Sequence, residues 1–250
     1  MTPRDSHSID LNCDVGEGAP HDDRLIPLVT SVNIACGVHA GDRGTMTATV
    51  ASAREHGVAF GAHPGHRDRE HFGRRQLAIS PAEAATLVAE QVATLADVAA
   101  ARPHHVKLHG GLYHQVAHDL SLAHAVCKRL ADDWPTLPIM LPAGSAARAV
   151  AKQHGLAVLD EAFADRAYAD DGSLVSRDQP GSVLTDAGHA AARAVRLIRD
   201  GVVTTASGRD LPLRADTLCI HGDSPHAFDL LLAIHSQLTA HQIRVARPPH

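Results

Sequence analysis

Short β-rich runs alternate with helical patterns along almost the whole chain, and this alternation constrains the fold more than any other feature. Strands that alternate with helices pair in parallel, with the helices packed against the outside of the sheet. The predicted strands cover residues 8–14, 31–36, 58–63, 105–110, 137–142, 156–163 and 216–222. The predicted helices cover residues 22–29, 43–56, 81–101, 119–132, 145–154, 186–200 and 225–241.

The number of these units favours a barrel. About seven strand–helix units lie within 250 residues, a length that is usual for a single barrel domain. No glycine-rich nucleotide fingerprint follows the first predicted strand, which argues against a doubly wound sheet. The stretch 164–185 breaks the alternation, and we expect a functional loop there, with a small hairpin at DDGS. We therefore expect one (β/α) barrel domain over residues 1–250, with frayed ends at 1–7 and 246–250.

Polar residues gather where the predicted strands end. In a (β/α) barrel the loops after the strands converge at one end, and that end carries the chemistry. Charged groups inside strands are costly to bury unless they are paired, so their repetition at this end indicates a site. The candidates are Asp10, Asn12, Asp14, Glu17, Asn33, His39, Asp42, His63, Lys107, His109, Arg166, His221 and Asp223, together with Arg177 in the long loop.

Lys107 is the candidate with the weakest alternative explanation. The chain has only three lysines, and Lys128 and Lys152 lie in helical patterns where an exposed amine is ordinary. A lysine inside a strand indicates a need for a compact positive charge, for example opposite a phosphate or an oxyanion. His109 follows two residues later and points to the same face of the strand. We expect replacement of Lys107 by methionine to leave folding intact and to abolish activity.

Several candidates also have a purely structural explanation. Asp10 and Asp14 could cap loops or pair with an arginine, and Asp42 could cap the helix that follows it. His63 could be a turn histidine whose bend is fixed by the proline after it. The four cysteines show no CxxC spacing, and we expect them to be small buried residues.

The bulk composition argues against several classes of partner. The formal net charge is −5, which gives no reason to expect nucleic acid or an anionic membrane as a partner. No apolar run approaches the roughly 20 residues that a bilayer crossing needs. The N-terminal segment has no apolar signal region. We therefore expect a cytoplasmic protein.

Several sequence blocks together resemble the LamB/YcsF family. They are IDLNCDVGEG, SVNIACGVHAGD, AFGAHPG with FGRR after it, HVKLHGGLY, EAFADRAYADDGSLVSR and CIHGD. These blocks follow one another in the family's order from residue 9 to about residue 226, so the resemblance covers most of the chain. It implies an incomplete (β/α)7 barrel related to the glycoside hydrolase/deacetylase superfamily, in agreement with the unit count.

The resemblance also implies an activity, which is the ATP-driven hydrolytic opening of 5-oxo-L-proline to L-glutamate. That reaction would take place in a complex with two other subunits, the B- and C-type components. ATP and its Mg²⁺ would be bound with or by these partners, and no tightly bound cofactor is expected. The sequence contains no GK dipeptide and therefore no Walker-type phosphate loop, which points to the same partners.

Under this hypothesis the candidates take different roles. Asp14 or His39 would activate the attacking water, and Lys107 with His109 or His63 would stabilise the oxyanion or the transferred phosphate. Arg166 or Arg177 would hold the substrate carboxylate. His221 and Asp223 would form a supporting pair. Asp42 is a further catalytic candidate, and the remaining substrate-binding candidates are Asp10, Asn12, Glu17 and Asn33.

Two other functions stay open at this point. Histidines and carboxylates on one rim could hold a divalent metal, which would make the protein a stand-alone metal-dependent hydrolase of amides or N-acyl groups. No HExxH motif occurs in the chain. The second alternative is a non-catalytic subunit that binds a lactam.

Overall fold

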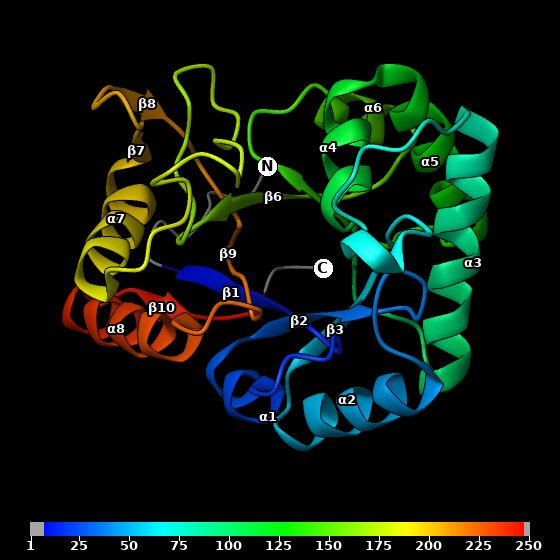
Figure 1. Ribbon diagram of the computed structural model, residues 1–250, viewed down its shortest axis with the longest axis horizontal. Helices are drawn as coiled ribbons and strands as arrows, with labels where there is room; N and C mark the ends of the chain where they lie inside the picture. The colour runs from blue at the N-terminus through cyan, green and yellow to red at the C-terminus, as the bar shows by residue number, and fades with distance from the viewer. Residues whose placement is uncertain (1–7, 248–250) are drawn as a thin grey trace.

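Seven parallel strands close into a barrel in the computed structural model, which describes residues 8–247 (Figure 1). Around the barrel they follow the order β1, β2, β3, β4, β5, β6 and β9, and β9 pairs back with β1. This confirms the seven-stranded barrel expected from the sequence. The bounds are β1 Ser8–Val15, β2 Ser31–Ala35, β3 Ala59–His63, β4 Val106–Lys107, β5 Ile139–Pro142, β6 Val158–Phe163 and β9 Thr217–Ile220.

Helices surround the strands, as Figure 1 shows. Ser80 caps α3 at its N-terminus, and the side chain of Glu83 accepts a hydrogen bond from the Ser80 amide, so the helix begins with a capping box. None of the helices within residues 8–247 combines the length and the apolar character that a bilayer crossing needs. The bounds are α1 Asp22–Leu25, α2 Arg43–Glu55, α3 Pro81–Ala99, α4 Gly110–His118, α5 Leu120–Asp133, α6 Ala147–Gln153, α7 Ala187–Asp200 and α8 Ala227–Ala240.

The structure differs from the sequence-based expectation at the fourth strand. A strand was expected over 105–110, but β4 ends at Lys107 and the chain turns into α4 at Gly110. The amide of His109 donates to the Pro64 carbonyl, and the amide of Gly111 donates to the Gly73 carbonyl. These residues therefore bond to the loop after β3, so they cannot extend the ladder with β5.

Smaller elements were also not foreseen. The predicted helix at 22–29 is only the short α1 and a 3-10 turn, η1 (Ile26–Leu28), and a second 3-10 turn, η2, spans Arg69–His71. A separate hairpin is formed by β7 (Val202–Thr204) and β8 (Asp210–Pro212), and β10 (Arg244–Val245) pairs with the start of β1.

The small hairpin expected at DDGS is present, because Tyr168 bridges to Leu174.

The expected frayed ends fall mostly outside the described residues. Residues 1–7 and 248–250 are not part of the described range. Within that range, the amide of Ala246 donates to the carbonyl of Ile9 at 2.9 Å.

The alternating side chains of β1 separate an apolar layer outside the barrel from a polar interior inside it. Ile9, Leu11, Cys13 and Val15 belong to the apolar core that fills the space between strands and helices. The residues between them point to the opposite face, into the barrel, because successive side chains of a strand alternate. The inside of the barrel is therefore polar from Asp10 at its N-terminal end upward.

Asp10 closes that N-terminal end. Its carboxylate accepts hydrogen bonds from the hydroxyls of Thr30, Ser31 and Thr217. Burial raises the pKa of Asp10 to about 6, although these three hydroxyls act in the opposite direction. Above Asp10, the buried ring of His105 lies against Gly61, and its Nε2 is 2.7 Å from Asn33 Oδ1.

We expect Gly61→Ala to destabilise the barrel, because the added Cβ would come within 2.2–2.5 Å of the His105 ring. Overpacking of this kind costs about 1–3 kcal/mol. Urea unfolding should show this loss in the free energy of unfolding. The control is Gly188→Ala in the first turn of α7, where the added Cβ meets only Asp186 Oδ1, at 3.4 Å. Equal stability of the two variants would contradict the packing argument.

We also expect Asp10 to make stability depend on pH. Its pKa rises from 3.8 to about 6 on folding, so the folded state favours the protonated carboxyl, and stability is lost as pH rises from about 4 to about 6. The variant Asp10→Asn lacks this loss. Its free energy of unfolding relative to wild type should therefore increase by up to about 3 kcal/mol between pH 4 and pH 7 in urea titrations. A pH-independent difference would contradict the assignment.

Candidate active site

A cavity of about 450 Å³ opens at the carboxyl end of the barrel strands. This size is typical of small-molecule sites, which span about 300–1,000 Å³. Its walls come from the ends of the strands and from the long loop after β6. Of the residues predicted from the sequence, it is lined by Asp14, Glu17, His63, Lys107, His109, Arg166, Arg177, His221 and Asp223.

Lys107 lies at the bottom of the cavity between two carboxylates. Its Nζ is 2.9 Å from Asp14 Oδ1, 2.9 Å from Glu161 Oε1 and 3.0 Å from Cys219 Sγ. Burial alone would lower the pKa of Lys107, but Asp14 and Glu161 raise it well above its ordinary value. The pKa of Asp14 is correspondingly held well below its usual range by His63 and Lys107, against the effect of burial. Both groups are therefore charged at neutral pH.

Two amides below the cavity fix these carboxylates. Asn33 Nδ2 donates to Asp14 Oδ1 and to Asn12 Oδ1, each at 2.8 Å. Asn12 Nδ2 in turn donates to Glu161 Oε1 at 3.1 Å and to Thr217 Oγ1 at 2.7 Å. Asn12 and Asn33, predicted as substrate-binding residues, do not line the cavity, and neither does Asp10. Their contacts orient the residues that do.

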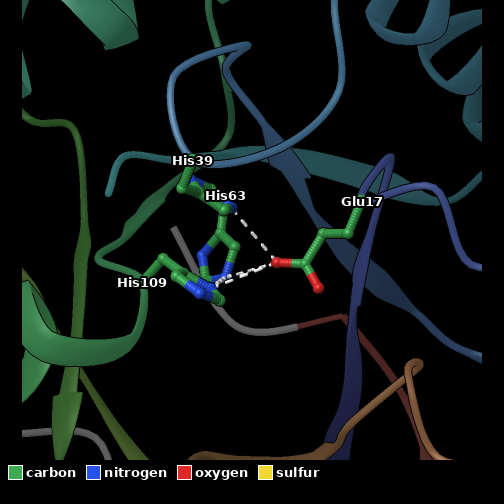
Figure 2. A group of neighbouring side chains, drawn as sticks. All are labelled: Glu17, His39, His63 and His109. Carbon is green, nitrogen blue, oxygen red and sulfur yellow. Dashed lines mark hydrogen bonds and ion pairs between the residues drawn. The ribbon is translucent and has the colours of Figure 1, made fainter. Parts of the chain in front are cut away.

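Beside Asp14 lies a second group, which we call the Glu17–histidine cluster, formed by Glu17, His39, His63 and His109. Figure 2 shows the three rings turned toward one carboxylate oxygen. Glu17 Oε1 is 3.2 Å from His39 Nε2, 3.7 Å from His63 Nε2 and 3.1 Å from His109 Nδ1. The rings of His39 and His109 are stacked, with centroids 4.0 Å apart.

The cluster shifts the pKa values of its members. Burial would raise the pKa of Glu17, but hydrogen bonds from His109 and His39 hold it below its usual range. Burial lowers the pKa of His39 to about 4. Burial would also lower the pKa of His63, but Asp14 and Glu17 raise it above its ordinary value. Asp14 and Glu17 are thus ionised.

His221 is held by Asp165, not by Asp223 as the sequence suggested. His221 Nδ1 lies 2.9 Å from Asp165 Oδ2, and its backbone amide donates to the same oxygen at 3.1 Å. A carboxylate accepts, so Nδ1 carries the proton and Nε2 is left for other contacts. The His221 ring also stacks on Phe163, with centroids 5.5 Å apart. Asp223 instead contacts Arg74 and lies 3.8 Å from Arg177.

The two arginines considered for substrate binding differ in their contacts. Arg166 is buried, and it donates to the carbonyls of Val175 and Ser182, at 2.6 Å and 3.3 Å. Arg177 is more exposed, and its ion pair with Asp223 spans a loose 3.8 Å. Arg166 therefore holds the long loop in place, whereas the guanidinium of Arg177 is available to the cavity.

Asp42 lies away from the cavity and caps α2. Its Oδ1 accepts from the Thr45 amide at 2.7 Å and from the Thr45 hydroxyl at 2.9 Å. This is the capping alternative that the sequence left open. His39, another predicted catalytic residue, is buried and does not line the cavity.

Sequence reasoning missed Glu161, which is buried inside the barrel. Its Oε1 forms an ion pair with Lys107, and its Oε2 accepts a hydrogen bond from the hydroxyl of Tyr113 at 2.6 Å. The signal was present, because an acid inside the predicted strand 156–163 is as unusual as the lysine at 107. It also assigned Arg74 no role in the site, although Arg74 lines the cavity from the loop after β3.

The contacts of Lys107 change the expectation for its replacement. Lys107→Met would leave two buried carboxylates without their partner, a kind of change that costs about 3–5 kcal/mol. We therefore expect a large loss in the free energy of unfolding, measured with urea. The double variant Lys107→Met with Glu161→Gln should recover part of it, because one of the buried charges is removed. Wild-type stability of the single variant would contradict this account.

Comparison with known proteins agrees with the fold. The chain is 47% identical to the A-type subunit of the 5-oxoprolinase from Bordetella parapertussis over 246 residues, which is 95% of this chain and 98% of that protein. The lactam utilization protein of Thermus thermophilus has a similar structure, with a TM-score of 0.89 and 39% identity, over 96% of this chain and 99% of that one. A family 4 carbohydrate esterase from Streptomyces lividans shares the fold alone, with a TM-score of 0.51 and 9% identity, over 96% of this chain and 92% of that one.

The sequence blocks, the closed barrel and these similarities point to one family. The profile of the LamB/YcsF family matches residues 9–250, almost the whole length of the chain. The protein belongs to the LamB/YcsF family.

Proposed function

We propose that this protein is the A-type subunit of an ATP-dependent 5-oxoprolinase, which opens 5-oxo-L-proline to L-glutamate together with B- and C-type subunits. The observation that carries the proposal is one cavity whose wall holds an available guanidinium, Arg177, and an ionised carboxylate, Asp14. The names of the relatives support the same role. ATP dependence also fits the expectation of a cytoplasmic protein.

Arg177 would bind the carboxylate of the lactam. A guanidinium forms two parallel hydrogen bonds with a carboxylate, which fixes the orientation of a small ring. Arg177 is only loosely paired with Asp223, so it can exchange this partner for the substrate.

Asp14 would orient the attacking water. Of the two bases considered, Asp14 and His39, only Asp14 lines the cavity. Lys107 and Asn33 both bond to Asp14 Oδ1, so Oδ2, whose contact with His63 Nε2 is a longer 3.4 Å, would accept from a water molecule. Lys107 therefore serves mainly to hold Asp14 in its charged form and in its position.

His221 would transfer the proton to the ring nitrogen. Its Nδ1–H is fixed on Asp165, so the opposite nitrogen can take a proton and pass it on, with the imidazolium stabilised by Asp165. A neutral amine is a far better leaving group than an amide anion, so this step matters for breaking the ring bond.

ATP would activate the amide before water attacks. Transfer of the γ-phosphoryl group to the lactam oxygen releases ADP and gives an imidate-type phosphate. Water adds to the former carbonyl carbon, the carbon–nitrogen bond breaks and the nitrogen takes a proton. A second water then hydrolyses the resulting acyl phosphate to glutamate and phosphate. We assign the binding of ATP and Mg²⁺ to the partners, because this sequence has no GK dipeptide.

The proposal is tested by co-purifying the protein with the products of neighbouring genes and measuring ATP-dependent release of glutamate from 5-oxoproline. Glutamate release by the isolated chain without ATP would favour the stand-alone hydrolase. Lactam binding that is indifferent to replacement of Asp14 would favour the non-catalytic subunit.

Two variants separate binding from chemistry in that assay. Arg177→Met should raise KM for the lactam by about 10–100-fold, because a charge-assisted contact is lost. Asp14→Asn should lower kcat by about 100-fold or more. The control is Arg43→Met, because the guanidinium of Arg43 pairs with Asp97 on the surface. An unchanged KM in the Arg177 variant would remove Arg177 from the site.

A further inference from the structure

The Glu17–histidine cluster contains three electron-pair donors that face one another. His63 Nε2 and His109 Nδ1 are 3.0 Å apart, and Glu17 Oε1 lies 3.7 Å from the first and 3.1 Å from the second. In the part of the chain that the structure describes, the ion pairs of Glu17 are with histidines alone. No lysine or arginine ion pair there supplies the charge that a buried carboxylate requires.

The protons of two of these rings are fixed by backbone carbonyls. His63 Nδ1 lies 2.8 Å from the Lys107 carbonyl oxygen, and His109 Nε2 lies 2.7 Å from the Phe72 carbonyl oxygen. A carbonyl only accepts, so these two nitrogens carry the protons. When an ion replaces the protons that these rings share with Glu17, the opposite nitrogens, which point at Glu17 and at each other, offer it their lone pairs.

We propose that Glu17, His63 and His109 bind a divalent transition-metal ion, with Zn²⁺ the closest match to this donor set. Two imidazoles and one carboxylate, with a fourth position left open, form a well-known type of catalytic metal site. Metal-binding histidines usually donate their other ring N–H to a carbonyl or carboxylate, as both rings do here. The ion would be a bound cofactor, in contrast to the sequence-based expectation that no tightly bound cofactor is present.

The distances agree with one ion at the centre of the three donors. Bonds of about 2.0–2.1 Å in tetrahedral geometry separate neighbouring ligand atoms by about 3.3–3.4 Å. The three observed separations, 3.0, 3.1 and 3.7 Å, lie around that value. The donors are therefore spaced for coordination without any rearrangement of the backbone.

His39 has a different role from the other two histidines. Its Nδ1 is buried and has no hydrogen-bond partner among residues 8–247, so a proton there would be unsatisfied. The proton belongs on Nε2, which donates to Glu17 Oε1 at 3.2 Å. Gly65 leaves no room for the ring to move away, because a Cβ at that position would lie 2.6 Å from His39 Nδ1. His39 is thus a positioning residue for the Glu17 ligand.

A neighbouring group of possible ligands is already neutralised. Asp14, Cys219 and His221 also lie close enough together to share an ion. However, the ammonium of Lys107 is 2.9 Å from Asp14 Oδ1 and 3.0 Å from Cys219 Sγ, so a positive charge already occupies the space between them. A second cation there would be repelled.

The proposed ion would be reachable from the cavity, because Glu17, His63 and His109 all line its wall. The metal site does not rest on the proposed function. It concerns ion binding by the full chain alone and would stand even if the substrate were a different lactam.

The test is titration of the chelator-treated full-length protein with Co²⁺, followed by competition with Zn²⁺. We expect one equivalent of Co²⁺ to bind, with the visible absorption of a low-coordinate site, and Zn²⁺ to displace it. Elemental analysis of the purified protein should find a transition metal near one equivalent. No stoichiometric binding by the wild-type protein would overturn the proposal, whatever the variants do.

Variants locate the ion. Glu17→Gln and His109→Gln should each lower Co²⁺ affinity by tenfold or more, because each removes a direct ligand. The matched control is His124→Gln, which removes one member of the exposed His124–His154 pair, 3.1 Å apart, on the surface. Circular dichroism checks that each variant is folded.

Two results would contradict this location. Loss of binding in His124→Gln with retention in Glu17→Gln would place the ion on the surface pair. A thiolate-to-cobalt charge-transfer band in the near ultraviolet would place it at Cys219. For His39, the variant His39→Gln keeps an N–H donor and should bind Co²⁺ more tightly than His39→Ala; equal losses would remove its positioning role.

Discussion

The buried ammonium of Lys107 is the interaction on which the polar interior of this barrel depends. Two carboxylates, Asp14 and Glu161, each lie 2.9 Å from it and share this one buried positive charge. Without the lysine, either carboxylate would have to be protonated or exposed, since isolated charges are very costly to bury. The same contacts keep Asp14 ionised at the bottom of the cavity, so stability and chemistry share one set of interactions.

The residues inside the barrel form layers below Lys107, Asp14 and Glu161. Asp10 and its three hydroxyl donors fill the N-terminal end, and the amides of Asn12 and Asn33 form the next layer. Each layer satisfies the polar atoms of the one above, so the charged layer rests on a rigid base of hydrogen bonds. The charged groups that line the cavity are therefore held by residues that do not line it.

At the top of the barrel the cavity wall has two chemically distinct sides. One side carries the Glu17–histidine cluster, which gathers electron-pair donors suited to a metal ion. The other carries Arg177 and the pair formed by His221 and Asp165, which suit a carboxylate and a proton transfer. Asp14 contacts both the buried lysine and the cluster. Its Oδ1 forms an ion pair with Lys107, and its Oδ2 lies 3.4 Å from His63 Nε2.

The sequence by itself determined the barrel and most of the ionisable residues that line the cavity, because strand–helix alternation and charged residues at strand ends are local patterns. It identified Lys107 and His109 from the strand they were expected to share. Tertiary structure alone decided the partners: that Asp165, not Asp223, holds His221, that Asp42 caps a helix, and that Arg166 is occupied by backbone carbonyls. It also decided that Glu17 meets three histidines from three other segments. Such pairings depend on distances between side chains far apart in the chain, and no local pattern encodes those distances.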